Sequence, residues 1–301
     1  MTDRPGPHPA PDSACGFSHK PASVCFSTPM SAPSDGSSRR LPAGRKADLA
    51  AYVAEQGQVT VALLAERFDV SPDTIRRDLD ALDADGVLIR THGGAISPQA
   101  VPRPDTGVEV RMRLQTTAKD QIGALAAGLV RDGAALMINA GTTTLAVARH
   151  LSEHRDLTVA TNSLRMPTEI NPLAFRDLYV FGGVVRLSAQ GTIGAVTFPT
   201  ENGTDRDIRC DLALIGVGAV SADAGYSTSN LGEAQMMSAM MDRSARVAIL
   251  ADSSKFGRRL FAQIAELRRA DYLVTDAPPP PDLAAALEAA GVEVLVPSAA
   301  A

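Results

Sequence analysis

The strongest constraint on the fold is an alternation of strand-like and helix-like segments over the last two thirds of the chain. The strand-like runs are short and almost continuously apolar, as in strands that are buried on both faces. This alternation predicts an α/β fold, a parallel sheet covered by helices on both sides. The expected strands are 135–138, 157–160, 179–181, 212–217, 247–251, 272–275 and 292–296, and the expected helices are 119–130, 143–151, 233–245 and 282–290.

A different pattern precedes this region. Between residues 45 and 96 apolar residues recur at three- and four-residue spacing in three short stretches, which predicts three short helices. The segment SPQAVPRPDTG that follows is a linker by composition. We therefore expect a small domain at 45–97, a linker at 98–110 and a larger domain at 111–301. Residues 1–44, rich in Pro, Ser and Gly, are expected to be disordered.

Composition excludes several classes of protein. Aromatic residues make up 4% and Trp is absent, which is atypical of RNA-binding surfaces that stack bases on aromatic rings. The three cysteines, Cys15, Cys25 and Cys210, form no CxxC pair, so neither a disulfide framework nor a structural zinc site is expected. No signal-peptide pattern and no membrane-spanning apolar run is found. We expect a soluble, cytoplasmic protein without metal or cofactor.

The small domain has the features of a helix-turn-helix. Ser71 is a good N-cap and Pro72 suits the first helical position of the last helix. In a helix-turn-helix the start of the second helix enters the major groove of DNA. The candidate DNA-binding residues at this helix start are Ser71, Asp73, Thr74, Arg76 and Arg77.

A short hairpin is expected after this helix. Gly86 is a candidate C-cap, and residues 87–90 and 95–96 flank a turn at His92, Gly93 and Gly94. Such a hairpin is the wing of a winged helix-turn-helix. Arg90 and His92 are the candidate contacts of the wing with phosphate or the minor groove.

The charge balance favours a competing hypothesis. The whole chain has a formal charge of −5, and residues 45–90 contain six basic against nine acidic residues, a net charge of −3. A three-helix module that docks a protein partner would tolerate this balance, whereas DNA binding requires cations near phosphates. Against this, Lys46, Arg76, Arg77 and Arg90 fall where a DNA-facing surface is expected, with Arg39, Arg40 and Arg45 just upstream.

Polar clusters follow several expected strands of the larger domain. The turn from Asn139 to Thr144 leads directly into a helix, and backbone N–H groups at a helix start favour phosphate. Ligands of open α/β sheets gather beyond the carboxyl ends of the strands. An equally open interpretation is that these residues only cap turns. The candidate effector-binding residues are Asn139, Gly141, Thr142, Thr143, Thr144, Thr161, Asn162, Ser163, Gly182, Gly183, Asp252 and Lys255.

Both regions resemble one family. The segment VSPDTIRRDLDALDADGVLIRTHGGA, with TIRRDL and the HGGA turn, resembles the helix-turn-helix and wing of the DeoR family of transcriptional regulators. The larger domain resembles the DeoR-type sensor domain, a Rossmann-like fold similar to ribose-5-phosphate isomerase. The stretches that carry this second resemblance are RMRLQTTAKDQIGALAA, NAGTTT, TNS, FGG, LADSSKFG and VTD.

The resemblance implies a repressor of a carbohydrate operon that binds operator DNA as a homo-oligomer and is released by a sugar phosphate. It implies the GTTT loop and Lys255 as phosphate contacts, with Lys119 in support. The chain departs from the family pattern at Asn139, usually Asp, and at Met237, usually Lys. The alternative is a sugar-phosphate enzyme, isomerase-like or related to folate-type ligases, with an attached helix-turn-helix. It requires a positioned carboxylate base, for which Asp252 is the remaining candidate.

Overall fold

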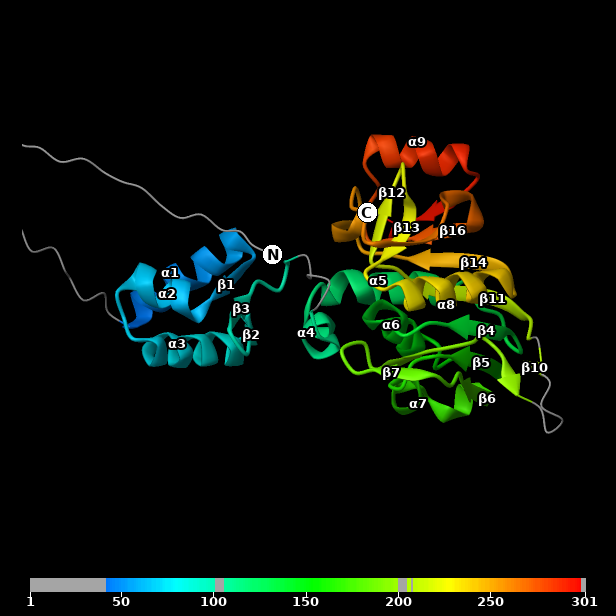
Figure 1. The fold of residues 1–301 in the computed structure, drawn as a ribbon, viewed down its shortest axis with the longest axis horizontal. Helices are drawn as coiled ribbons and strands as arrows, with labels where there is room; N and C mark the ends of the chain where they lie inside the picture. The colour runs from blue at the N-terminus through cyan, green and yellow to red at the C-terminus, as the bar shows by residue number, and fades with distance from the viewer. Residues whose placement is uncertain (1–41, 101–105, 200–204, 207, 299–301) are drawn as a thin grey trace, which may run out of the picture. The chain divides into compact units, whose positions relative to one another are not determined.

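The computed structural model describes residues 42–100, 106–199, 205–206 and 208–298 (Figure 1). Residues 1–41, and with them most of the segment predicted to be disordered, lie outside the described residues. So do residues 101–105 of the predicted linker.

The small domain is a winged helix. Helices α1 (Pro42–Gln56), α2 (Val61–Phe68) and α3 (Pro72–Ala84) pack on a three-stranded antiparallel sheet of order β1-β3-β2. Its strands are β1 (Gln58–Thr60), β2 (Ile89–Thr91) and β3 (Gly94–Ile96). The predicted hairpin is β2–β3, whereas β1 has no counterpart in the predicted elements. A side chain at Gly94 would meet the Val59 carbonyl oxygen at 1.9 Å, so only glycine allows β3 to approach β1.

The core of the winged helix is aliphatic. It is formed by the inward residues of all three helices and of the sheet, and it explains the three- and four-residue spacing in the sequence. Its buried members are Leu49, Val53, Val59, Val61, Leu64, Ile75, Leu79, Leu82, Leu88 and Ala95.

The larger domain contains the predicted parallel sheet. Seven strands have the order β17-β16-β14-β11-β4-β5-β6, and every neighbouring pair is parallel. All seven predicted strands are present, with shifts of a few residues at their ends. In sheet order they are β17 (Glu293–Leu295), β16 (Tyr272–Val274), β14 (Ser244–Leu250), β11 (Cys210–Gly216), β4 (Ala135–Ile138), β5 (Leu157–Thr161) and β6 (Phe175–Val180).

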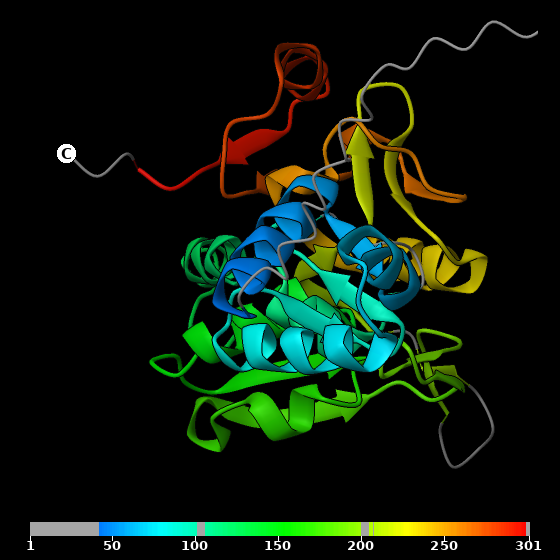
Figure 2. The same cartoon turned by 90° about the vertical axis from the view of Figure 1, so that its left-hand side faces the viewer.

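Helices cover both faces of this sheet, as the apolar strands predict. Alternate residues of one strand enter different cores: Ala213 and Ile215 lie in one cluster, Leu212 and Leu214 in the other. The first cluster includes α8 (Leu231–Asp242) and α9 (Pro281–Ala289), and the second includes α5 (Thr116–Ala127) and α6 (Thr142–His150). Figure 2 shows α5 and α8 on opposite sides of the sheet.

Several smaller elements escaped the sequence analysis. An antiparallel sheet of order β12-β13-β15 packs in the same cluster as α8. Its strands are β12 (Ala219–Ser221), β13 (Gly225–Thr228) and β15 (Ala262–Ala265). The others are α4 (Val108–Arg113), α7 (Met166–Glu169), the hairpin β7 (Val184–Arg186) and β8 (Gly191–Ile193), the pair β9 (Phe198–Pro199) and β10 (Asp205–Arg206), and the 3₁₀ turns η1 (Pro172–Ala174), η2 (Ser253–Lys255) and η3 (Leu267–Arg269). Within the described ranges, no helix has both the length and the apolar character needed to cross a membrane.

Candidate functional site

Local capping fixes both ends of α3. The backbone of Ser71 is extended, and its hydroxyl accepts a hydrogen bond of 3.2 Å from the N–H three residues later, so Ser71 is the predicted N-cap. The helix ends at Ala84 with Asp85 as its C-cap, and Gly86 follows with a φ of +71°. There the N–H of Val87 donates to the Leu82 carbonyl at 3.0 Å, the hydrogen bond of a Schellman motif. The predicted N-cap is confirmed, whereas the C-cap is Asp85 and the predicted residue, Gly86, follows it.

One face of α3 is anchored and the other is open to solvent. Ile75 and Leu79 are fully buried against the rest of the winged helix, whereas Asp73, Arg76 and Arg77 are exposed. Arg76 forms an ion pair of 2.5 Å with Asp73. None of the described residues forms a hydrogen bond or ion pair with the Arg77 side chain. Within the described ranges, Arg77 is therefore a cation without an internal partner in the first turns of α3.

The remaining predicted DNA contacts are partly engaged within the domain. The Thr74 hydroxyl lies 2.9 Å from the Ser71 hydroxyl. Arg90 of the wing lies 2.5 Å from Asp80 of α3, and its backbone N–H donates to Asp83 at 2.9 Å. His92 is exposed in the turn of the wing. The ion pair with Asp80 fixes the wing to the C-terminal half of α3.

Internal pairing engages several charged residues of the small domain. Arg45 of α1 donates to Asp78 of α3 at 2.7 Å, and the side chain of Asp78 is only 7% exposed. This hydrogen bond raises the pKa of Arg45. The sequence grouped Arg45 with the cations near DNA, but the structure pairs it with a buried carboxylate because α1 packs on α3. The pairs Arg45–Asp78 and Arg90–Asp80 each take up one basic and one acidic residue, so the net charge of −3 over residues 45–90 is unchanged.

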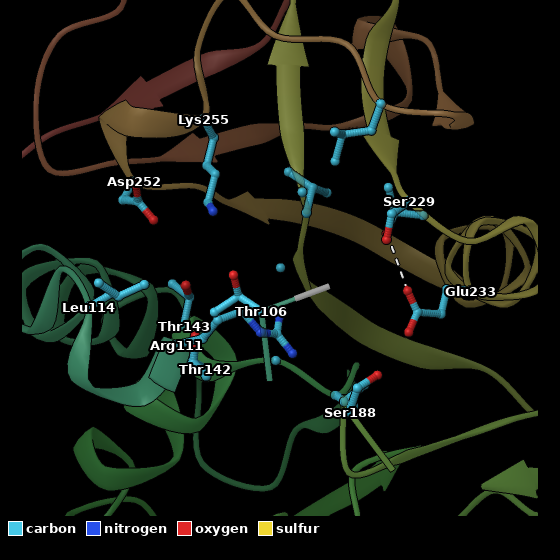
Figure 3. A pocket seen from close by; sticks show the side chains of 18 of the residues that line it. Thr106, Arg111, Leu114, Thr142, Thr143, Ser188, Ser229, Glu233, Asp252 and Lys255 are labelled. Carbon is cyan, nitrogen blue, oxygen red and sulfur yellow. Dashed lines mark hydrogen bonds between the residues drawn. The ribbon is translucent and has the colours of Figure 1, made fainter. Parts of the chain in front are cut away.

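A cavity lies in the larger domain where β4 and β11 are neighbours (Figure 3). From β4 the chain continues outward through β5 and β6, whereas β11 leads to β14, β16 and β17 on the other side. Ligands of open α/β sheets bind at such a reversal, beyond the carboxyl ends of the strands. Residues 140–143 after β4 and 216–218 after β11 line the cavity, as do Asp252 and Lys255 after β14.

Segments from elsewhere in the chain complete the cavity. Arg111 of α4 enters it beside Thr142 and Thr143, and Lys255 reaches toward it from the other side of the view (Figure 3). Arg186 of β7 lies 3.0 Å from Glu233 of α8, and both side chains line the cavity. With Lys119 of α5, the cavity gathers charged side chains from five separate segments of the chain.

Lys119 is the most deeply buried of the basic residues in the cavity. It is 7% exposed, and its ammonium donates to the carbonyl oxygens of Leu114, at 2.5 Å, and of Arg111. Burial lowers the pKa of Lys119 to about 8, although the carboxylate of Asp252 partly offsets this effect. Lys119 thus ties the C-terminal end of α4 to α5 within the cavity.

Two further cations are poorly solvated. Burial lowers the pKa of both Arg111 and Lys255, with Glu233 partly offsetting the effect for Arg111 and Asp252 for Lys255. The Nε atom of Arg111 is buried and has no hydrogen-bond partner among the described residues. An unpaired buried donor of this kind is costly, and an anionic ligand in the cavity would relieve the cost.

The structure brings together part of the predicted effector site. Five of the twelve predicted residues line the cavity, and they come from the loops after β4 and β14. These five residues are Gly141, Thr142, Thr143, Asp252 and Lys255.

The side chains of Asn139 and Thr144 are engaged next to the cavity. The amide of Asn139 donates to the Gly216 carbonyl at 2.9 Å and accepts from the Gly216 N–H at 2.8 Å. The Thr144 hydroxyl donates to the carbonyls of Asn139 and Gly141 at 2.8 and 2.9 Å. Both side chains hold the ends of β4 and β11 in place, and neither lines the cavity.

The predicted residues after β5 and β6 are also engaged within the fold. Asn162 donates to the Thr192 carbonyl at 2.7 Å, and the Thr161 hydroxyl accepts from the Ser163 N–H at 3.0 Å. The Ser163 hydroxyl accepts from the Met166 N–H at 3.1 Å. Gly182 and Gly183 follow β6 and lie close to the end of β8. A side chain at Gly183 would meet the Ile193 carbonyl oxygen at 2.2 Å. Their contact with an effector stays a prediction.

Sequence reasoning missed the cations that complete the cavity, Arg111, Arg186 and Arg258. Arg111 belongs to the cluster RMR just after the predicted linker, which was the available signal. Arg186 and Arg258 stand in a hairpin and a loop without a recognisable pattern. Met237, one of the departures from the family pattern, lines the cavity as well.

Models of two protein families match the chain. Residues 45–101 match the DeoR-like helix-turn-helix domain, and residues 114–277 match the DeoR C terminal sensor domain.

Characterised relatives are similar over most of their length. The HTH-type transcriptional regulator GlpR of Haloferax volcanii is 32% identical over 255 residues, 85% of this chain and 98% of the relative. The glycerol-3-phosphate regulon repressor of Escherichia coli K12 is 32% identical, covering 76% and 88%. The HTH-type transcriptional repressor GlcR of Bacillus subtilis is 32% identical, covering 81% and 92%.

Solved structures give weaker likenesses. Ribose 5-phosphate isomerase from Plasmodium falciparum matches with a TM-score of 0.32 and 12% identity over 46% of this chain and 53% of that one. eIF2B beta from Chaetomium thermophilum matches with a TM-score of 0.40 and 14% identity over 60% and 55%. A shared fold does not imply a shared function.

Proposed function

Because the chain belongs to the DeoR family of DNA-binding transcriptional regulators, we propose that it represses a carbohydrate operon and leaves its operator when a phosphorylated sugar or related intermediate binds. In this proposal residues 45–97 bind DNA and residues 111–301 bind the effector, with 98–110 as the linker. The names of the relatives, which include repressors, support this function.

The exposed start of α3 supports the DNA-binding half. In a helix-turn-helix the first residues of the second helix face base edges and phosphates. Thr74, Arg76 and Arg77 occupy these positions, and Arg77 has no internal partner in the described part of the chain. Arg90 and His92 of the wing are in turn the proposed contacts with phosphate or the minor groove.

The surplus of basic side chains in the cavity is the observation that carries the effector-binding half. The cavity lies beyond the carboxyl ends of β4, β11 and β14. There the N–H groups at the start of α6, the hydroxyls of Thr142 and Thr143 and the ammonium of Lys255 offer the donors that a phosphate requires.

The position of α4 supports a coupling between the two halves. This helix follows the linker, and its Arg111 lines the cavity. Lys119 holds the last turn of α4 through the carbonyls of Arg111 and Leu114. An effector that contacts Arg111 and Lys119 binds with different affinity when α4 shifts, which is the condition for a ligand to change the state of the protein.

We propose that the cavity binds its ligand without turnover. The side chain of Asn139 is committed to the backbone of Gly216, so no carboxylate base stands at the end of β4. Asp252 is the carboxylate beside Lys255, and its Oδ1 accepts a hydrogen bond from Ser254. Conversion of ribose 5-phosphate to ribulose 5-phosphate by the purified protein would overturn this part of the proposal.

We also propose that the protein acts as a symmetric dimer or larger assembly in the compartment that holds the DNA. Each chain has one recognition helix, and helix-turn-helix proteins read two half-sites about 10–10.5 base pairs apart with two copies. Light scattering on the purified protein measures the oligomeric state directly. A monomer that binds its operator with full affinity would contradict the proposed assembly.

The test is a gel shift with the DNA upstream of the protein's own gene, at fixed salt, with a panel of sugar phosphates. Lys255→Ala should bind this DNA like the wild type, but the effector concentration needed for release should rise at least about tenfold, since a charge-assisted hydrogen bond is lost. Arg131→Ala, an exposed residue outside the cavity, is the control. Release of Lys255→Ala at the wild-type concentration would remove Lys255 from the site.

A further inference from the structure

The cavity carries more positive charge than one phosphate needs. Five basic side chains line it against two acidic ones, which leaves a net charge of +3. The acidic residues are Glu233 and Asp252, and the basic ones are Arg111, Lys119, Arg186, Lys255 and Arg258.

Most of this charge has no acidic partner. Arg186 is paired with Glu233 at 3.0 Å, whereas Arg111, Lys255 and Arg258 form no ion pair with an acidic residue in the described ranges. Asp252 accepts a hydrogen bond from Ser254. The positive charges of Arg111 and Arg258 act on Lys255 and add to the effect of burial in lowering its pKa. The cations therefore repel one another in a poorly solvated space.

A phosphate monoester carries a charge of only about −1.5 to −2 at neutral pH. One such group leaves about +1 to +1.5 of the positive charge in the cavity without compensation, and burying this charge under a ligand is costly. Building on the proposed function, we propose that the effector is a sugar phosphate with a second acidic group, a carboxylate or a second phosphate. Such a ligand brings about −2.5 to −4 charges, which brackets the +3 of the cavity.

The cations are placed to meet two acidic groups. Lys255 and Arg258 belong to the loop after β14, whereas Arg111 comes from α4. In Figure 3 Lys255 and Arg111 enter from opposite sides, and Thr142 at the start of α6 lies beside Arg111. One acidic group of the effector lies at Lys255 and Arg258, and the other lies at Arg111 and the N–H groups of α6.

The rest of the lining fits a sugar between the two acidic groups. Hydroxyls of Thr106, Ser188, Thr228 and Ser229 line the cavity, and they match the hydrogen-bonding needs of sugar hydroxyls. No aromatic side chain of the described residues lines it, so there is no platform on which a nucleotide base would stack. A sugar with two acidic groups fits this lining better than a nucleotide.

The experiment compares matched ligands by calorimetry and by release of the upstream DNA at constant ionic strength. Glucose 6-phosphate is paired with 6-phosphogluconate, and fructose 6-phosphate with fructose 1,6-bisphosphate. In at least one pair the ligand with two acidic groups should bind at least about tenfold more tightly, as charge-assisted hydrogen bonds predict. Arg258→Gln and Arg111→Gln should each reduce this ratio below about threefold, and the exposed Arg268→Gln should preserve it.

The outcomes separate the two proposals. Equal affinity for the two ligands of each pair, together with release of DNA, would overturn the proposal that the effector has a second acidic group. The proposed function would stay intact. If none of the four sugars binds, crystals soaked in sulfate decide: two sulfate ions in the cavity, one at Lys255 and one at Arg111, support the inference, and one or none overturns it. Failure of every phosphorylated compound to release bound DNA would instead contradict the proposed function.

Discussion

Asn139 and Gly216 exchange two hydrogen bonds between the ends of β4 and β11, where the order of the sheet reverses. The Asn139 side chain both donates and accepts, and the residue is 1% exposed. A carboxylate can accept the Gly216 N–H but cannot donate to the Gly216 carbonyl. The asparagine is therefore suited to this position, where the family resemblance led us to expect aspartate.

Asn139→Asp should reduce the free energy of unfolding by about 1–3 kcal/mol at neutral pH, because a carbonyl loses its donor and a carboxylate is buried. The loss should shrink in acid, where the protonated aspartic acid can again donate. Urea unfolding at neutral and acidic pH measures both effects. Equal stability of the variant and the wild type at neutral pH would show that this pair does not hold the strand ends together.

Glu233→Gln should strengthen effector binding. The substitution removes one of two negative charges from the cavity and raises its net charge from +3 to +4. It also frees Arg186 from its ion pair. We expect about three- to tenfold higher affinity for an anionic effector, in keeping with the modest strength of partly exposed charge pairs. Calorimetry measures the change, with the exposed Glu266→Gln as control. Weaker binding would instead show that Glu233 contacts the effector.

The pH dependence of effector binding should reflect Lys119. Its pKa of about 8 belongs to the empty cavity, where burial and the charges of Lys255 and Arg111 lower it and Asp252 raises it. An anion favours the protonated ammonium and raises this pKa, so binding takes up a proton near pH 8. Affinity should therefore fall as the pH rises through about 8, where the free protein loses the charge of Lys119.

Calorimetry in two buffers of different ionisation enthalpy counts the protons taken up. In Lys119→Arg the guanidinium stays charged over this pH range. This variant should therefore lose the fall in effector affinity near pH 8. If the effector affinity of the wild type is constant between about pH 7 and pH 9, effector binding does not change the protonation of Lys119.

Elements that depend on local sequence were predictable. The buried parallel strands stand out because they are apolar on both faces. The boundaries of α3 follow from Ser71 and Gly86, whose capping is a local interaction. The antiparallel strands β12, β13 and β15 were missed because their short sequences, AVS, GYST and AQIA, contain polar residues and glycine and lack the apolar run that marks equally short parallel strands such as β4.

The effector cavity was only partly predictable for a different reason. Polar residues at strand ends look alike whether they face a ligand or a backbone group. Thr142 and Thr143 line the cavity, whereas the side chains of Thr161 and Asn162 form hydrogen bonds with backbone groups of the fold. Arg111, from a separate part of the chain, reaches the cavity only through tertiary packing, which local patterns do not encode.

The most direct test of the account is the salt-controlled affinity of wild type and Arg77→Ala for the DNA upstream of the gene, measured by fluorescence anisotropy against unrelated DNA. We expect selective binding by the wild type and a loss of about ten- to a hundredfold in Arg77→Ala, because a base or phosphate contact of α3 is removed. Arg131→Ala should bind like the wild type, since this exposed residue lies in the sensor domain. No preference for the upstream DNA, or full affinity of Arg77→Ala, would contradict α3 as the element that reads the operator.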